Sequence, residues 1–255
     1  LAPGICEEII LKNKYPEKVI EIPNACDLEI FKNLEMSKKI VPKSINKIKI
    51  HNGKKIKLLA AFTGAHGLAN GLDSVLDAAK KLIEMGRDDI HIVLIGDGLL
   101  KSKLKKKKFD EKIYNCHFID PVPKLELAEI LKQNVHLGLM ILKDVPAFYR
   151  GTSPNKFFDY LSTGLPILIN YPGWMSEIVL NNNLGIKVKQ NDPEDFAKGL
   201  IYLSDNKKLL QEMSDNSRKI AEQKFSRNDL SQKFVRIINK TFSENHSRVK
   251  NFHKR

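Results

Sequence analysis

The chain has 255 residues, 42% of them hydrophobic, and a formal net charge of +13. This composition allows a buried core, so we do not expect a disordered chain except at the tail. No apolar run approaches the ~20 residues that a membrane-spanning helix needs, and the first residues, Leu1-Ala2-Pro3-Gly4, lack a signal-peptide pattern, so we interpret the start as a truncation.

Much of the positive charge lies in two segments, residues 101–108 and 248–255. Such runs are most often a solvated helix face and a loose tail, and the alternative is attraction to an anionic membrane surface. Few aromatic residues interleave with them, so we expect no nucleic-acid partner. The cysteines Cys6, Cys26 and Cys116 lie far apart, which indicates a reduced, cytoplasmic chain without a metal site.

The first part of the chain resembles the end of a domain that is otherwise missing. Residues 1–31 contain a short strand pattern at 18–22 and the turn Pro23-Asn24-Ala25-Cys26-Asp27. Residues 32–54 are polar and lysine-rich, as expected of a linker. We expect the main domain at 55–225, followed by a last helix and a basic tail at 226–255.

From residue 55 onward, strand and helix patterns alternate. Strands are expected at 57–63, 90–95, 117–119, 135–142, 166–170 and 185–188. Helices are expected at 71–85, after Gly98, and at 124–133, 154–163, 174–180, 193–204, 206–224 and 226–243. This order predicts an α/β fold, a Rossmann-like parallel sheet with helices on both faces. Ligands bind at the carboxyl ends of such strands, so function is expected in the loops there.

One of these loops opens a helix with an anion-binding pattern. Ser153 is a natural N-cap, Pro154 fits the first helical position, and Gly164 fits the C-terminal cap. Free amides and the helix dipole attract phosphate there. Lys156 in the first turn opposes the dipole, which makes sense beside a bound anion.

Asp159 shares a helix face with Asn155 and Lys156, one turn deeper. A carboxylate beyond a phosphate site is placed to accept hydrogen bonds from ribose hydroxyls. The alternative is a capped helix with a surface Lys-Asp pair.

A second loop, residues 64–71, carries three glycines between a strand and a helix, although it matches neither G-x-G-x-x-G nor the P-loop. Its backbone amides could approach a pyrophosphate, and His66 could donate to a phosphate oxygen. The alternative is a mobile turn with a solvated histidine. The turn at Gly98 is a weaker signal, and the short loop around Val122 could hold a base by backbone hydrogen bonds and side-chain packing. We interpret Glu177 as a helix residue.

Together, these motifs resemble the C-terminal domain of retaining glycosyltransferases of family 4, which have the GT-B fold. The resemblance covers residues 1–240 and depends on the order of the motifs, from the Pro-Asn-Ala-Cys-Asp turn to the segment Pro154-Asn155-Lys156. It is nearest to bacterial surface-polysaccharide transferases. It implies that an acceptor-binding domain precedes Leu1 and that the helix at 226–243 crosses back to it.

The resemblance also implies site residues. The family's second donor-site glutamate corresponds to Asp159, but the first falls at Gly151, which has no carboxylate, and Arg150 or Lys156 would supply positive charge. The residues expected to bind the donor are Gly64, His66, Gly67, Gly98, Val122, Arg150, Ser153, Asn155, Lys156 and Asp159.

The implied reaction transfers a sugar, with retention, from a nucleoside diphosphate sugar, expected to be a UDP-sugar. The acceptor would be a polysaccharide or a lipid-linked saccharide, and no cofactor or metal is implied. No nucleophile–base triad is visible, so catalytic residues stay unassigned. Two alternatives remain open: a sugar-nucleotide epimerase of the same fold, and a non-catalytic binding or scaffolding module.

Overall fold

The alternating hydrophobic runs form one six-stranded parallel sheet. We describe a computed structural model that covers residues 3–33, 45, 48, 50–51 and 54–252. The sheet has the order β5-β4-β3-β6-β7-β8. Its strands are β3 (Leu58–Thr63), β4 (Ile90–Ile95), β5 (Cys116–Ile119), β6 (Leu137–Met140), β7 (Ile167–Ile169) and β8 (Gly185–Lys187). The expected α/β, Rossmann-like fold is thus confirmed, with strand ends shifted by one or two residues.

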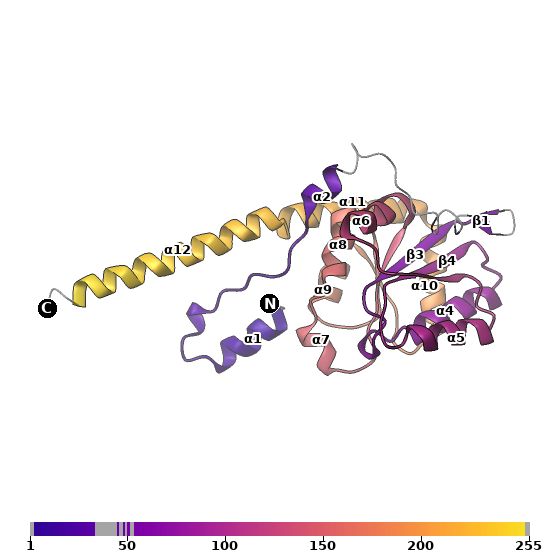
Figure 1. Cartoon of the computed structure of the whole chain (residues 1–255), viewed down its shortest axis with the longest axis horizontal. Coiled ribbons are helices and arrows are strands. Elements are labelled where there is room, and N and C mark those ends of the chain that lie inside the picture. The colour runs from indigo at the N-terminus through magenta and orange to yellow at the C-terminus, as the bar shows by residue number, and fades with distance from the viewer. Residues whose placement is uncertain (1–2, 34–44, 46–47, 49, 52–53, 253–255) are drawn as a thin grey trace.

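Helices cover both faces of the sheet (Figure 1). They are α4 (Asp73–Glu84), α5 (Lys101–Asp110), α6 (Lys124–Asn134), α7 (Ala147–Gly151), α8 (Asn155–Thr163), α9 (Trp174–Asn181), α10 (Pro193–Asp205), α11 (Lys207–Lys224) and α12 (Arg227–Phe252). The short helix α7 lies in a segment expected to be a loop. Gly86 and Gly164, both with φ +70°, follow α4 and α8 in the left-handed conformation of a helix C-cap.

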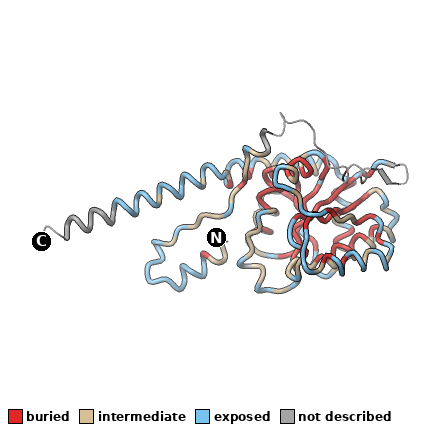
Figure 2. Tube along the Cα trace, viewed as in Figure 1, coloured by how far each residue is buried: buried red, intermediate tan, exposed pale blue. Residues whose placement is uncertain are grey.

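The two helical layers enclose two hydrophobic cores. Along β3, Leu58, Ala60 and Phe62 pack toward α4, α5 and α10, whereas Leu59 and Ala61 pack toward α6, α8 and α9. This alternation follows from the two-residue repeat of a strand. Figure 2 shows the buried residues concentrated in the sheet and on the inward faces of the helices. Because both faces of the sheet are covered, ligands can reach it at the ends of the strands. We call these two sides of the sheet its amino edge, where the strands begin, and its carboxyl edge, where they end.

The N-terminal segment forms two short helices, α1 (Pro3–Lys12) and α2 (Leu28–Asn33), with the 3-10 turn η1 (Pro16–Lys18). The strand expected at 18–22 is wrong, because no strand among the described residues lies beside it to complete a hydrogen-bonded ladder. Most of the expected linker at 32–54 lies outside the described residues. Its described end forms a hairpin of β1 (Ile50–His51) and β2 (Lys54–Lys55).

Residues 24–27 pair with residues 225–227, and we call this junction the clamp. The Cys26 N–H donates to Phe225 O at 2.7 Å, and the Arg227 N–H donates to Cys26 O at 3.1 Å. Arg227 also forms an ion pair with Asp27. The clamp therefore joins the N-terminal segment to the first turn of α12.

Helix α12 extends away from the domain (Figure 1). It continues to Phe252 instead of ending near residue 243, so most of the tail expected to be loose is helical. Phe234, Val235, Ile238 and Phe242 on it are at least half exposed. Within the described residues, no helix is both long and apolar enough to cross a bilayer.

Candidate functional site

The order of the strands places a crevice beside the end of β3. From β3, the chain moves outward through β4 to β5, and then returns to place β6 on the other side of β3. Open parallel sheets bind ligands at such a switch point, outside the carboxyl ends of the strands. The loops after β3, β4 and β5 and the first turn of α8 gather there.

Two glycine loops pack directly against each other at this edge. A Cβ atom on Gly96 would lie 2.0 Å from Gly64 O, and one on Gly98 would lie 2.8 Å from His66 N and O. The His66 N–H donates to Asp97 O at 2.8 Å. A side chain at position 96 or 98 would therefore clash with the β3 loop, and the close packing of the two glycines holds that loop in one position.

The same packing buries His66 completely. Its ring centroid lies 5.9 Å from that of Phe118 and 6.4 Å from that of Phe62. Neither ring nitrogen has a hydrogen-bond partner within the described part of the chain. Burial, with a further contribution from Lys101, lowers the pKa of His66 to about 4, so the ring is neutral. The alternative of a solvated histidine in a mobile turn is wrong.

Lys156 projects from the first turn of α8 onto the end of β3. Its Nζ lies 3.5 Å from the centroid of the Phe62 ring, and 3.8 Å from where a Cβ on Gly64 would lie. Among the described residues, no carboxylate forms an ion pair with it. Burial lowers the pKa of Lys156 to about 7. The site thus holds a cation whose electrostatic partner is an aromatic face.

The start of α8 differs from the sequence expectation. The helix begins at Asn155 after Pro154, with no side-chain cap, so Ser153 as the N-cap is wrong. Instead, Ser153 Oγ is buried without a partner in the described structure, and the Ser153 carbonyl accepts from Asn24 Nδ2 at 2.7 Å. Asn24 Nδ2 also lies 3.4 Å from Asn155 Oδ1, so the clamp contacts the first turn of this helix.

Tyr160, which the sequence analysis missed, fixes α8 against β3. Its hydroxyl accepts from the Thr63 N–H at 3.0 Å and donates to Ala61 O at 3.1 Å. A Cβ on Gly138 of β6 would lie 2.5 Å from the Tyr160 ring, so only glycine there leaves room for the ring. The position of Lys156 therefore depends on this buried tyrosine, four residues further along the helix.

Asp159 points to a different neighbour than Lys156 does. Asp159 is 8% exposed, and its carboxylate forms an ion pair with Lys124 at the start of α6. Burial raises the pKa of Asp159 although Lys124 opposes the shift, and the charges of Asp27 and Arg227 also reach it. The two α8 side chains expected to form one surface instead diverge, Lys156 toward β3 and Asp159 toward α6 and the clamp.

A cavity of about 340 Å³ lies at the ends of these strands, lined by Gly64, Asp97 and Val122, by their neighbours in the three loops and by Leu127 of α6. Lys101, a residue of the supposedly solvated lysine run, supports its wall. Lys101 is 7% exposed, and its Nζ donates to Gly96 O at 2.7 Å and to Asp120 Oδ1 at 2.6 Å. It therefore ties the β4 loop to the β5 loop.

The other expected site residues are less engaged. Gly67 precedes the turn η2 (Leu68–Asn70), and a Cβ on it would meet nothing within 4 Å. Arg150 lies in α7, but its side chain is outside the described structure. A Cβ on Gly151 would lie 3.4 Å from Ile5 of α1. Glu177 is exposed on α9. Within the described residues, no three His, Cys, Asp or Glu side chains gather as metal ligands.

The fold and this edge of the sheet define a class of protein. The family described as "Glycosyl transferases group 1" matches residues 43–220, and the chain belongs to this family. One solved structure like it is the C-terminal domain of a group 1 glycosyltransferase from Francisella tularensis, at 16% identity and TM-score 0.57, covering 79% of this chain and 98% of that one. The fold is therefore that of the C-terminal half of GT-B enzymes.

Two further relatives are informative. Anabaena HepE, solved with UDP and glucose, has TM-score 0.70 at 14% identity, covering 93% of this chain and 61% of that one. An Escherichia coli UDP-Gal:α-D-GlcNAc-diphosphoundecaprenol α-1,3-galactosyltransferase is 28% identical over 83% of this chain and 52% of its own length. The chain thus spans about half the length of the curated relatives it matches.

Proposed function

We propose that the chain is the donor-binding half of a retaining family 4 glycosyltransferase that uses a UDP-sugar. The observation that carries this proposal is Lys156, a half-buried cation beside Gly64 at the switch point of the sheet, with no carboxylate partner among the described residues. A diphosphate there would accept hydrogen bonds from the Lys156 ammonium and from the free N–H groups in the first turn of α8. The uracil base would lie in the cavity at Val122, and Asp159 would face the ribose.

In this scheme, the chain stabilises the leaving group. Charge develops on the diphosphate as the sugar departs, and preorganised donors in a water-poor site stabilise that charge most. Lys156 and the amides around Gly64 and α8 are held in place by Tyr160 and the packed glycine loops. Residues 1–31 and α12 would contact an acceptor-binding domain that precedes Leu1. Residues 55–225 would form the donor domain.

The test is a titration of this chain with UDP and GDP by calorimetry. We expect UDP to bind more tightly, in line with the UDP in the Anabaena structure and the UDP-galactose in the name of the Escherichia coli relative. A clear preference for GDP would contradict the uridine assignment. Equal, weak binding of both nucleotides would contradict the placement of the donor site.

We propose a polysaccharide or lipid-linked saccharide as the acceptor, as the name of the Escherichia coli relative suggests for that enzyme. Sugar transfer by the full-length protein, with the anomeric configuration of the product determined by NMR, tests both acceptor and retention. We expect this 255-residue chain alone to transfer little or no sugar.

One observation favours a second candidate, a donor-binding module without catalysis. Position 151, where the family's first glutamate would stand, is a glycine beside Ile5. Full-length protein that binds UDP-sugar tightly but neither transfers, hydrolyses nor epimerises it would establish this candidate instead.

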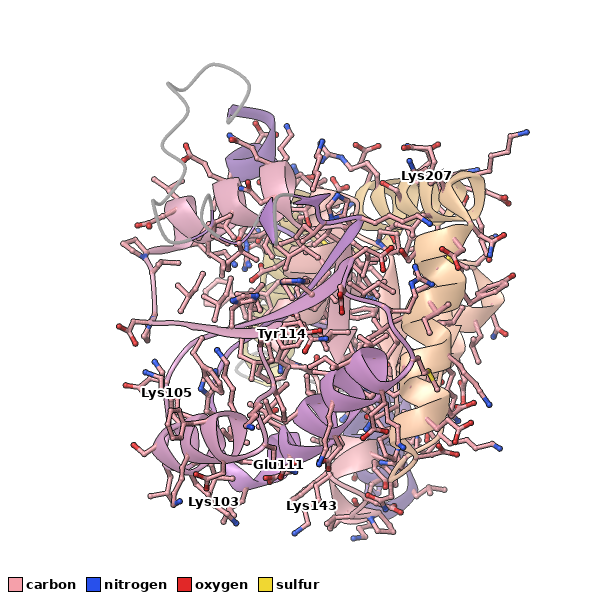
Figure 3. All side chains as sticks on the ribbon, turned by 90° about the vertical axis from the view of Figure 1, so that its right-hand side faces the viewer. Lys103, Lys105, Glu111, Tyr114, Lys143 and Lys207 are labelled. Atoms are coloured by element: carbon pink, nitrogen blue, oxygen red, sulfur yellow. The ribbon has the colours of Figure 1, made fainter. Side chains whose placement is uncertain are left out.

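We also propose that α5 approaches an anionic membrane surface on the cytoplasmic side. Figure 3 shows Lys103 and Lys105 projecting from α5 into solvent, and Leu99 and Phe109 beside them are 83% and 84% exposed. Each basic residue near such a surface adds ~1 kcal/mol. Cosedimentation with acidic vesicles should fall as salt rises, and binding that ignores salt would contradict the proposal.

A further inference from the structure

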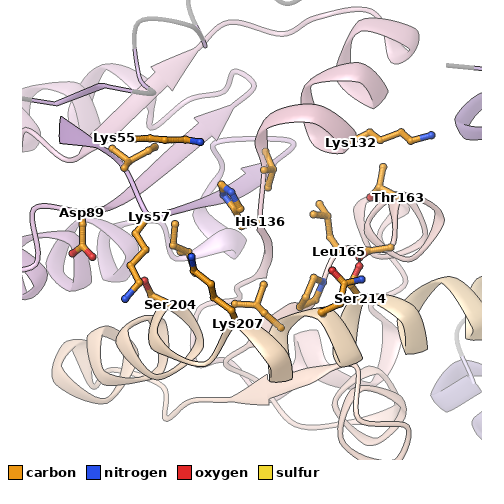
Figure 4. Close-up of a pocket in the computed structure, with 17 residues that line it drawn as sticks. Lys55, Lys57, Asp89, Lys132, His136, Thr163, Leu165, Ser204, Lys207 and Ser214 are labelled. Carbon is orange, nitrogen blue, oxygen red and sulfur yellow. Dashed lines mark hydrogen bonds between the residues drawn. The ribbon is translucent and has the colours of Figure 1, made fainter. Parts of the chain in front are cut away.

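A further groove lies at the opposite end of the sheet, its amino edge, where β3, β6 and β7 begin. It encloses about 750 Å³, which is the size of a small-molecule site. Leu58, Val135 and Leu165 contribute to its floor, and residues from the first two turns of α11 form one wall (Figure 4). Nothing in the proposed donor site uses this space.

The groove is strongly basic. Among the described residues, its lining includes the lysines Lys55, Lys57, Lys132 and Lys207 and one acidic residue, Asp89. Arg87 already binds both carboxylate oxygens of Asp89, at 2.8 and 3.0 Å. Asp89 is therefore not available to neutralise the lysines.

A second acid, in contact with the lining residue Lys57, is also engaged. Asp205 forms an ion pair with Lys57 at 2.6 Å and with Arg87 at 2.9 Å. Among the described residues, neither Lys55 nor Lys207 makes an ion pair with a carboxylate. The rim thus keeps uncompensated positive charge around a space that is open to a ligand.

The groups that face the groove also favour an anionic ligand. In Figure 4, the side chains of Lys55 and Lys207 reach toward the space in which the His136 ring lies. His136 Nδ1 accepts the Leu59 N–H at 3.0 Å, which fixes the orientation of the ring. Helix α11 begins at Lys207 with no acidic residue in its first turn and no side-chain cap. Its positive dipole end adds to the field of the lysines.

We propose that this groove is a second anion-binding site that takes the phosphate group of an organic ligand. Lys55 and Lys207 contact the phosphate, and the first turn of α11 faces it. The volume exceeds that of a single phosphate, so the organic part lies along the apolar floor. The same phosphate chemistry could come from a soluble phosphate ester or from the headgroup of a lipid.

The test uses this chain carrying Lys156→Met, so that the α8 site cannot account for binding. Inorganic pyrophosphate is titrated by calorimetry, and we expect Lys55→Gln/Lys207→Gln to weaken binding at least tenfold. The control Lys219→Gln/Lys224→Gln removes the same charge from exposed positions of α11 far from its first turn and outside the groove, and should change affinity less than twofold. Equal binding by both double variants, or no pyrophosphate binding at all, would overturn the proposal.

Two further arms sharpen the result. Restored affinity with Lys55→Arg/Lys207→Arg, and an unchanged melting temperature in the Gln variant, separate charge recognition from unfolding. Vesicles containing phosphatidic acid distinguish the sources. Sedimentation that depends on Lys55 and Lys207 indicates a lipid headgroup, whereas pyrophosphate binding without it indicates a soluble ester. Because every arm carries Lys156→Met, failure here leaves the donor-site proposal untouched, and the reverse also holds.

Discussion

Helices α5 and α8 each place a lysine in their first turn at the carboxyl edge of the sheet, yet the two lysines meet opposite surroundings. Lys101 donates to Gly96 O and Asp120, so its charge is fully used within the chain. Lys156 contacts the ring of Phe62, and no carboxylate among the described residues forms an ion pair with it. A buried cation that the chain itself satisfies serves structure, whereas a half-buried cation that it leaves unsatisfied is available to an anionic ligand.

The largest effect should come from Lys156→Met. Loss of a charged contact to the diphosphate should cost about 1.5–3 kcal/mol, roughly ten- to a hundredfold in UDP affinity. The melting temperature should stay unchanged or rise, since the substitution removes a desolvated charge. Calorimetry and thermal unfolding on the same samples check both expectations. Unchanged UDP affinity would contradict the claim that Lys156 binds the diphosphate.

Lys101→Met should act on stability instead. The substitution leaves Gly96 O without its donor and frees Asp120, so the free energy of unfolding should fall by about 1–2 kcal/mol. Urea denaturation measures the change, with Lys103→Met on the exposed face of α5 as the matched control. If Lys101→Met is as stable as the parent, Lys101 is not the structural counterpart of Lys156.

Asp159→Ala tests whether the second α8 side chain, which lies toward α6, contacts the ribose. If Asp159 faces the ribose, affinity for UMP and for UDP should each fall about tenfold, as expected for one charged hydrogen bond. Lys156→Met should weaken UDP far more than UMP. Titration of both variants with both nucleotides separates the roles. Parent-like UMP binding by Asp159→Ala would show that this carboxylate serves only Lys124.

The smallest effect is a pH dependence of UDP binding. The pKa of Lys156 is about 7 in the free chain, and an adjacent diphosphate would raise it, so the complex would hold more protons than the free protein. Affinity should therefore fall as pH rises, by about fivefold from pH 7 to 8. Calorimetry in buffers of different ionisation heat should show proton uptake. Lys156→Arg, which stays charged, should give a flatter profile.

The elements most accessible from sequence were those set by local chemistry. Gly164 ended its helix as predicted because a left-handed residue there favours glycine. The strands were predictable because each is a short apolar run buried on both faces. The neighbourhood of Gly64 and Lys156 was also predictable, since both stand at ends of elements that meet at one edge of the sheet.

The features that the sequence did not predict depend on contacts between distant residues. Lys101 lies within a run of lysines, and only the distant Asp120 distinguishes it from its solvated neighbours. Tyr160 resembles any core aromatic until Gly138, 22 positions earlier on β6, makes room for its ring. Ser153 has the composition of a cap, but Asn24 draws its carbonyl into another interaction. A strand at 18–22 would need a neighbour that local sequence does not specify.

The clamp gives the molecule a mechanical property. Helix α12 has 26 residues, so at 1.5 Å per residue it is a rod of about 39 Å whose root is bonded to residues 24–27. A tilt of only about 5° at this root would displace the far end by about 3 Å on the same helix geometry. Asn24 joins that root to Ser153 and Asn155. A force that tilts α12 would therefore also displace the first turn of α8, and a ligand bound at that turn would resist the tilt.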